Sequence, residues 1–178
     1  MLPTPTFDDL YAPFPDQSDR PAVEFLSPGE VPEPYHRLLV HTHHMTVTVE
    51  AFYGDAVDVR PKQVARAGDD YARKIVLALR GSGRVVQFGL VRVDLGKLPP
   101  AVKDEIVSER TPLGRVLINA GVLRTVRPTA YYRATPTPTM CEWLELAAPV
   151  PLYGRLGVLT VNGEPAVEVA EILVPVPG

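Results

Sequence analysis

Cysteine is almost absent from this sequence, and that excludes an internal disulfide. The 178 residues include one cysteine, Cys141, whereas a disulfide needs two. The chain also lacks an 18-residue apolar run and a charged leader followed by an apolar stretch, so we expect neither a membrane span nor secretion. Together these absences predict a cytoplasmic protein.

Strong charge and the common short motifs of catalysis are missing as well. The formal net charge is −3, which provides no electrostatic reason for binding nucleic acid or an anionic membrane. The sequence contains no GxGxxG, CxxC or GxSxG element, so it does not support dinucleotide binding, dithiol redox chemistry or a hydrolase built on a nucleophile elbow. An anionic ligand would have to be bound by individual arginines.

Proline, by contrast, is abundant, and its distribution divides the chain. The 20 prolines gather at residues 3–34, at 128–151 and at the C-terminus, which marks these segments as loops or extended connections. We interpret residues 1–30 as a proline-rich N-terminal arm and residues 31–178 as one domain, large enough to enclose a small-molecule cavity. The arm is rich in aromatic residues; it either packs across the domain surface in extended form or is mobile.

Alternating patterns predict several strands joined by hairpins. The glycines of Arg80-Gly81-Ser82-Gly83 suit a tight turn, and Asn162-Gly163 is typical of a type I′ turn. Residues 45–53 alternate β-branched, polar and aromatic side chains, as a half-buried strand does. The predicted strands therefore cover residues 45–53, 57–64, 71–79, 84–93, 123–133, 155–161 and 165–174.

Three segments have the features of helices. Ser27-Pro28-Gly29-Glu30 combines a capping serine with proline at the first helical position, which predicts a short helix running toward Val40. Residues 101–109 place apolar side chains at helical spacing, and residues 113–119 precede a glycine that suits a helix end. Strands, two helices and then strands again predict an α+β fold with a single antiparallel β-sheet and a few flanking helices.

Two charged residues stand inside apolar, strand-like runs. By alternation Arg73 shares a face with Tyr71, Ile75 and Leu77, and Glu171 lies where both faces are largely apolar. A solvated edge-strand arginine and a tolerated charge near the C-terminus are the simpler interpretations. If both charges are buried, however, the cost of burial indicates a site for a small polar ligand.

Two further segments are candidates for binding. In Thr111-Pro112-Leu113-Gly114-Arg115, proline stands where a helix can begin, and the free N–H groups that follow suit a ligand oxygen, although an ordinary capped helix start has the same pattern. His41-Thr42-His43-His44 invites a metal interpretation, but no cysteine or carboxylate lies nearby at ligand spacing. We therefore predict no metal site.

Several short motifs occur in the order found in one enzyme family. The sequence contains, in this order, Met45-Thr46, Arg73-Lys74-Ile75, Thr111-Pro112-Leu113-Gly114-Arg115, Tyr153-Gly154-Arg155 and Glu171-Ile172-Leu173-Val174-Pro175. Between residues 36 and 175 the chain thus resembles chorismate lyase, which splits chorismate into 4-hydroxybenzoate and pyruvate. It departs from some members after Gly89, where an arginine-threonine pair is lacking.

The resemblance implies a fold, a reaction and a set of site residues. It implies a chorismate lyase-like domain that needs no cofactor or metal, with chorismate as substrate and 4-hydroxybenzoate as product, in many bacteria for ubiquinone biosynthesis. Arg73 and the backbone amide of Met45 would hold the ring carboxylate, while Glu171 and the amide of Leu113 would hold the ring hydroxyl. Arg73 and Glu171 would be the catalytic residues, and Arg115 matches a further family arginine that would contact either the substrate or a protein carboxylate.

Two other functions are compatible with the same residues. The ligand-sensing domains of a class of bacterial repressors are similar in fold to chorismate lyase, and such a domain would bind a small aromatic ligand without transforming it. Those repressors carry an N-terminal DNA-binding unit, whereas residues 1–40 here are proline-rich and acidic, which favours the enzyme. A lyase for a related enolpyruvyl compound such as isochorismate is the other alternative. The oligomeric state is left open.

Overall fold

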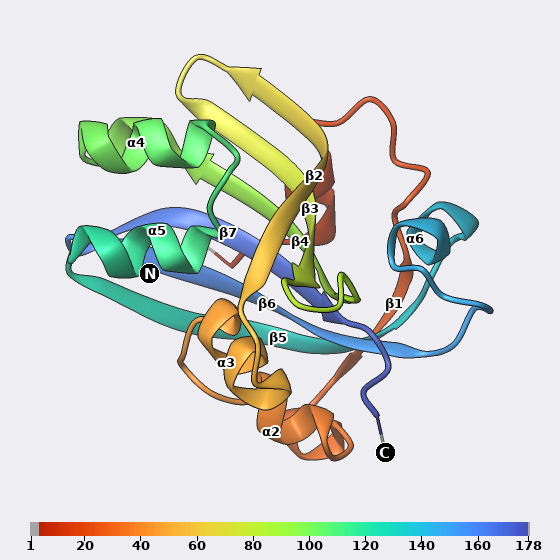
Figure 1. Cartoon of the computed structure of the whole chain (residues 1–178). Helices are drawn as coiled ribbons and strands as arrows, with labels where there is room; N and C mark the ends of the chain where they lie inside the picture. Colours follow the sequence, from red (N-terminus) through yellow and green to blue (C-terminus); the bar gives the residue numbers. More distant parts are fainter. Residues whose placement is uncertain (1–3, 178) are drawn as a thin grey trace.

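The chain folds around one seven-stranded antiparallel sheet (Figure 1). The structure is a computed structural model that describes residues 4–177. Its strands are β1 (Ala22–Leu26), β2 (Val57–Ala67), β3 (Asp70–Leu79), β4 (Val85–Asp94), β5 (Arg124–Thr135), β6 (Leu152–Val161) and β7 (Glu164–Leu173), in the spatial order β1-β5-β6-β7-β4-β3-β2. The expected α+β class with a single antiparallel sheet and flanking helices is confirmed.

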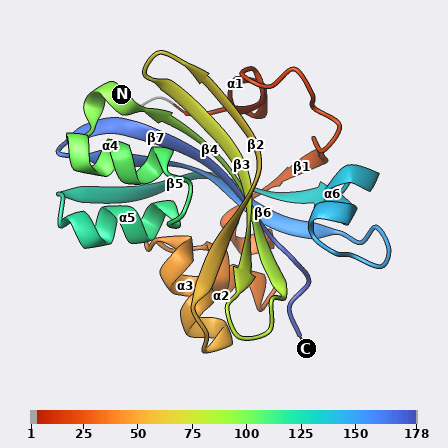
Figure 2. The same ribbon diagram turned by 45° about the horizontal axis from the view of Figure 1, so that its top comes forward.

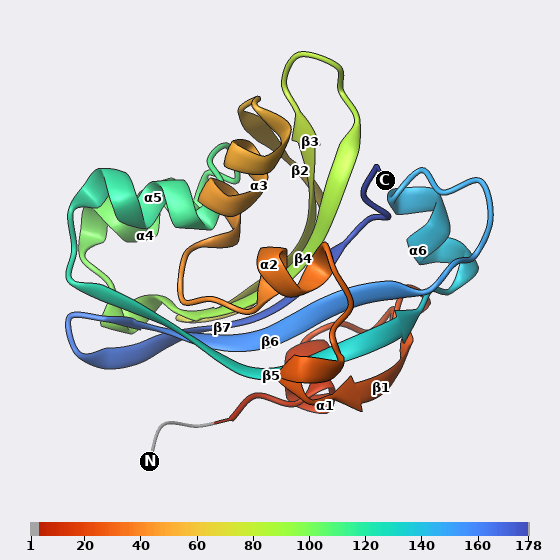
Figure 3. The same cartoon turned by 90° about the horizontal axis from the view of Figure 1, so that it is seen from below.

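Short helices flank the sheet. They are α1 (Phe7–Tyr11), α2 (Tyr35–Leu39), α3 (Met45–Tyr53), α4 (Pro100–Val107), α5 (Leu113–Ala120) and α6 (Pro138–Trp143), with 3₁₀ turns at Pro28–Glu30 and Leu95–Lys97. Helices α4 and α5 lie side by side (Figure 2). Helices α3, α4 and α5 lie on one side of the sheet and α1 lies on the other (Figure 3).

The segment 45–53 is a helix, and the predicted strand there is wrong. Its buried residues, Met45, Thr46 and Val49, have helical spacing, and Gly54 ends the helix in the left-handed region with φ of 68°. Threonine and valine favour strands only weakly compared with packing. The contacts that α3 makes with α5 decide its structure.

One other local prediction differs from the structure, and three short elements were not predicted. The helix expected from Ser27 toward Val40 is a 3₁₀ turn followed by the separate helix α2, with Pro32 and Pro34 between them; proline lacks the N–H that a continuous helix needs. The sequence patterns did not predict α1, β1 or α6 at all. Each of these three has five or six residues, which is too short for a periodic signal.

The N-terminal arm packs against the sheet face opposite α3 and α5. Its described part contains α1, whose Phe7, Leu10 and Tyr11 are buried, and β1, which pairs with β5 as an edge strand. The prediction that the arm packs across the domain in extended form therefore holds for β1 only. Residues 1–3 of the predicted arm lie outside the described residues.

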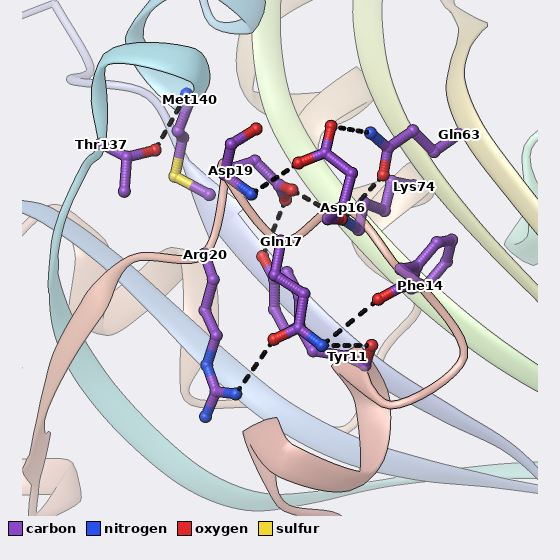
Figure 4. Close-up of polar contacts among 11 residues, drawn as sticks. Tyr11, Phe14, Asp16, Gln17, Asp19, Arg20, Gln63, Lys74, Thr137 and Met140 are labelled. Carbon is purple, nitrogen blue, oxygen red and sulfur yellow. Dashed lines mark hydrogen bonds and ion pairs between the residues drawn. The ribbon is translucent and has the colours of Figure 1, made fainter.

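A fully buried lysine anchors this arm (Figure 4). The Lys74 ammonium donates hydrogen bonds to Asp19 Oδ1 at 2.6 Å, to Gln63 Oε1 at 2.8 Å and to the Asp16 carbonyl at 3.0 Å. Tyr11 donates its hydroxyl hydrogen to Asp19 at 2.9 Å. All three ammonium hydrogens have acceptors, so the charge is buried in a satisfied network.

Candidate functional site

A cavity lies between the sheet and the N-terminal ends of α3 and α5. Its walls include Met45, Arg73, Leu113 and Glu171, which are four of the five residues that the sequence placed at a ligand site. These residues come from α3, β3, α5 and β7, so only the tertiary structure brings them together. The fifth, Arg115, is not part of the wall.

The cavity is small in the structure without a ligand. Its volume is about 50 Å³, whereas a dry cavity that binds benzene in another protein has a volume of about 150 Å³. A ring-sized ligand would therefore have to displace wall side chains or the two helix ends. The strands that form the floor are extensively hydrogen-bonded to their neighbours, so the helical side is the part that can move.

Arg73 extends from β3 into the site and is 1% exposed. Its guanidinium donates to the carbonyls of Ile106 at 3.2 Å and Thr111 at 3.3 Å, while its Nε is buried without a hydrogen-bond partner. Within residues 4–177 no carboxylate forms an ion pair with Arg73. Burial lowers the pKa of Arg73, and Tyr71 and Glu109 oppose that shift. A buried cation with an unused donor is a natural anion site.

Glu171 has a partner that the sequence patterns did not identify, Arg155 on β6. The Arg155 Nε donates to Glu171 Oε2 at 2.7 Å, and both residues line the cavity. Glu171 is therefore not surrounded by apolar side chains alone, since its carboxylate faces the Arg155 guanidinium. Arg155 stands in the motif Tyr153-Gly154-Arg155, and that was the only sequence signal available for it.

Arg155 also fixes the segment that leads into α3. Its guanidinium donates to the backbone carbonyls of Leu39 at 3.2 Å, His41 at 2.9 Å and His43 at 2.9 Å. Because Met45 begins α3 directly after this segment, Arg155 positions the Met45 amide relative to Glu171. One buried side chain therefore links the sheet floor of the cavity to its helical wall.

Two helix N-termini meet at the cavity. Met45 and Leu113 are the first residues of α3 and α5, and the preceding residues, His44 and Pro112, make no side-chain cap hydrogen bond. The first N–H groups of a helix have no partner within it. Gly114 permits the close approach, since a Cβ there would lie 3.0 Å from Thr46 Oγ1.

The charged side chains that line the cavity carry one net positive charge. The wall contains two arginines, Arg73 and Arg155, and one glutamate, Glu171. His44 also lines the cavity, but burial, with smaller effects of Arg124 and Arg155, lowers its pKa to about 4, so it is neutral at pH 7. The site therefore suits one anionic group of a small ligand.

Arg115, which the sequence placed at the ligand site, does not line this cavity. It reaches from α5 to α3 and forms an ion pair with Glu50. Glu50 in turn accepts a hydrogen bond from the Val57 backbone N–H at 3.1 Å. Of the two contacts that the sequence left open for Arg115, the structure shows the protein carboxylate.

The histidine cluster is engaged in local contacts. The His41 Nε2 lies 2.7 Å from the Leu38 carbonyl oxygen, and the His44 Nε2 accepts a hydrogen bond from Arg124 Nε at 3.0 Å. In the described part of the chain, no group of three His, Cys, Asp or Glu side chains is arranged to hold a metal ion. None of the helices in that part is both long and apolar enough to cross a membrane.

Comparison with known proteins gives a fold and leaves the activity open. No family model and no curated protein sequence matches this chain. The solved structure of PhnF from Mycobacterium smegmatis is similar, with a TM-score of 0.57 and 14% identity over 76% of this chain and 65% of that chain. This chain thus spans just under two thirds of PhnF, and the likeness supports a chorismate lyase-like fold.

Two weaker structural likenesses were also found. The gene product SA0254 from Staphylococcus aureus has a TM-score of 0.49 and 7% identity over 66% of this chain and 82% of that chain. The possible transcriptional regulator YydK from Bacillus subtilis has a TM-score of 0.48 and 12% identity over 66% of this chain and 58% of that chain. The fold assignment rests on PhnF alone.

Proposed function

We propose that the cavity binds a ring compound through its carboxylate and that the chain is a chorismate lyase, forming 4-hydroxybenzoate and pyruvate. The observation that carries the proposal is the buried Arg73 guanidinium, which has an unused donor and, within residues 4–177, no ion pair with a carboxylate. A guanidinium holds a carboxylate with two parallel hydrogen bonds. The Met45 amide supplies a second donor for the same group.

The proposed reaction depends mainly on how the protein orients the substrate. The ether C–O bond of chorismate breaks, the ring loses the proton beside its hydroxyl, and the released electron pair completes an aromatic ring; the departing enolate takes up a proton to become pyruvate. Because aromatisation drives the step, no cofactor is needed. The protein contributes a fixed ring position and matching electrostatics.

Glu171 is assigned the hydroxyl end of the ring. Arg155 donates to one carboxylate oxygen, Oε2, so the other oxygen can accept the hydrogen of the ring hydroxyl. The Leu113 amide, at the start of α5, can donate to the hydroxyl oxygen. We therefore propose that Glu171 acts as a hydrogen-bond acceptor for the ring hydroxyl, held in place by Arg155.

A second candidate is a binding domain that does not transform its ligand. The structural likeness to PhnF is compatible with it. The net positive charge of the cavity wall favours it, because one aromatic monocarboxylate such as 4-hydroxybenzoate would neutralise that charge. A lyase for a related enolpyruvyl substrate would use the same residues. The candidates differ in whether chorismate is consumed and in which product forms.

The test is to incubate purified protein with chorismate and measure pyruvate and 4-hydroxybenzoate by chromatography, and to titrate 4-hydroxybenzoate calorimetrically. Arg73→Met should weaken 4-hydroxybenzoate binding by about 10²-fold, as expected for a lost charged hydrogen-bond pair. The change removes a buried charge, but it also removes the hydrogen bonds to the Ile106 and Thr111 carbonyls, so urea denaturation checks that the variant is folded. The exposed Arg80, paired with Asp58 on the surface, provides the control Arg80→Ala.

Each outcome selects one function. Product formation by the wild type that Arg73→Met abolishes supports the lyase. Tight binding of 4-hydroxybenzoate with chorismate unchanged supports the binding domain. If neither compound binds, or if Arg73→Met binds as the wild type does, the assignment of Arg73 to a carboxylate is wrong.

A further inference from the structure

Gln87 is a buried polar residue of the cavity whose amide oxygen has no partner. It lies on β4, is 3% exposed and lines the same cavity as Arg73 and Glu171. Within residues 4–177, nothing donates a hydrogen bond to its buried amide oxygen. A buried acceptor without a partner is costly and rare in native proteins. Because an amide oxygen only accepts, the group that satisfies it must be a hydrogen-bond donor.

The side chains beside Gln87 on the sheet provide no such donor. Leu77 pairs with Gln87 from β3, and Leu173 pairs with it from β7. Both leucines are buried. Two residues along β4 on the same face lies Gly89, which has no side chain. The acceptor is therefore surrounded on the sheet by groups that cannot pair with it.

The strand register places Gln87 at the end of the cavity floor away from Arg73. Arg73 pairs with Val91 on β4, and Gly89, two residues back along the same strand, pairs with Glu171 on β7. Gln87 is two residues further back on the same face, and each such step spans about 7 Å. A ring whose carboxylate lies on Arg73 thus extends toward two acceptors, Glu171 and Gln87.

A ring with one hydroxyl group cannot satisfy both acceptors. In the proposed function, the hydrogen of the ring hydroxyl goes to the Glu171 carboxylate, which Arg155 holds. A hydroxyl group has a single hydrogen to donate, so the Gln87 oxygen would stay unpaired beside bound 4-hydroxybenzoate. A ligand that satisfies both acceptors carries a second donor on the ring carbon next to the hydroxyl.

We propose that the cavity binds a benzoate with two adjacent hydrogen-bond donors and that the Gln87 amide oxygen accepts from the second one. The second donor is a hydroxyl or an amino group at position 3 of 4-hydroxybenzoate. This inference rests on the proposed function for the position of the ring carboxylate on Arg73, and it goes beyond the lyase product, which has one donor. An ether substituent, as on a lyase substrate, would have to lie on the other side of the hydroxyl.

The test compares four benzoates by calorimetric titration of the whole chain. They are 4-hydroxybenzoate, 3,4-dihydroxybenzoate, 3-amino-4-hydroxybenzoate and 3-methoxy-4-hydroxybenzoate. The wild type should bind the dihydroxy or the amino compound about tenfold more tightly than 4-hydroxybenzoate, as expected when a buried acceptor gains its donor. The methoxy compound fills the same position without a donor, so it should not bind more tightly. The compound that is preferred identifies the donor as O–H or N–H.

Three variants assign this preference to the Gln87 oxygen. Gln87→Leu removes the acceptor and should reduce the preference to within about twofold, whereas Gln87→Glu keeps an acceptor oxygen at the same place and should retain it. Leu77→Met is the matched control, because Leu77 pairs with Gln87 and lines the same cavity; it should change all four affinities alike. Thermal unfolding checks that each variant is folded, and Gln87→Met replaces Gln87→Leu if the latter does not fold.

The results separate the two proposals. If the wild type binds none of the four compounds, the proposed function fails and this inference fails with it. If 4-hydroxybenzoate binds but neither compound with a second donor binds more tightly, only the inference about Gln87 is overturned. A preference that survives in Gln87→Leu also overturns it, and so does a preference that is lost in Gln87→Glu.

Discussion

The two buried arginines of the cavity differ in how completely their hydrogen bonds are satisfied. Arg155 donates to Glu171 and to three backbone carbonyls, whereas Arg73 donates to two carbonyls and leaves Nε unpaired. Of the five N–H donors of a guanidinium, Arg155 thus uses four and Arg73 uses two, so Arg73 retains more donors for a ligand. Arg155 is therefore a positioning residue, and Arg73 is the proposed ligand residue.

His44 leads to a prediction about pH. Its folded pKa is about 4, below the ordinary value of 6.5, so between these values the unfolded chain binds a proton that the folded chain does not. The unfolding free energy should consequently be highest above pH 6.5 and decrease as the pH falls toward 4. The expected decrease is about 1 kcal/mol, after allowance for the partial exposure of His44. Urea denaturation of the wild type and of His44→Gln at several pH values measures this.

Removal of the imidazole should flatten that part of the pH profile, because glutamine does not titrate. Parallel profiles for the wild type and His44→Gln would show that another group is responsible. His44→Gln also removes the contact with Arg124. Loss of that contact should change the unfolding free energy by the same amount at every pH, so the same measurements separate it from the effect of the proton.

At the scale of elements, the contact of α3 with α5 determines the shape of the cavity. Gly114 lies where the two helix N-termini approach, and a Cβ at this position would lie 3.0 Å from Thr46 Oγ1 and 3.1 Å from His44 Cβ. These atoms belong to α3 and its N-cap residue, which the backbone holds. A side chain at Gly114 therefore requires Thr46 or His44 to shift by a few tenths of an ångström, and we expect the two helix ends to move apart.

Gly114→Ala should destabilise the fold by about 1–3 kcal/mol, as overpacking does, and weaken 4-hydroxybenzoate binding because the Met45 and Leu113 amides move apart. Urea denaturation and calorimetric titration measure the two effects. Gly29→Ala is the matched control, since a Cβ there meets nothing within 4 Å; it should change stability by less than about 0.5 kcal/mol. Equal effects of the two substitutions would contradict the steric argument.

Across the whole molecule, β3 connects the two sides of the sheet. Arg73 faces the cavity beneath α3 and α5, while its neighbour Lys74 faces the N-terminal arm and holds Asp19. The alternation of a strand places these adjacent cations on opposite faces. Ligand binding and arm docking are therefore expected to be separable functions of one strand.

Either single change to the buried pair should be strongly destabilising. Asp19→Leu or Lys74→Met alone leaves one charge buried and unpaired, which costs about 3–5 kcal/mol. The double variant removes both charges and should cost less than the worse single change. Urea denaturation of the four proteins measures the coupling, and 4-hydroxybenzoate binding should change little in the double variant. Additive losses of stability would show that the two residues do not act as a pair.

The sequence predicted those parts of the fold that depend on a few neighbouring residues. The hairpin turns at 80–83 and 162–163 and the glycine end of α5 at Gly121 are all present, because turn and cap preferences depend on a few neighbouring residues. The strand predicted at 45–53 failed because the packing of α3 on α5 outweighs the preferences of valine and threonine.

The site was predicted in part for a related reason. The alternation of the strand pattern predicted that Arg73 points inward, and Arg73 lines the cavity. The same pattern could not identify Arg155 as the partner of Glu171. The hairpin of β6 and β7 contains a register shift between Leu159 and Thr160. A regular two-residue hairpin would set Arg155 opposite Ala170, and the shift sets it opposite Glu171.

By itself, the sequence determined the fold class, the hairpins, the positions of α4 and α5 and which strand faces carry charge, since each follows from short-range sterics and periodicity. Only the tertiary structure decided that α3 is a helix, that the arm is anchored by Lys74, and that residues from four separate elements enclose one cavity. Those features depend on contacts between segments far apart in the chain, whose free energy no local pattern contains.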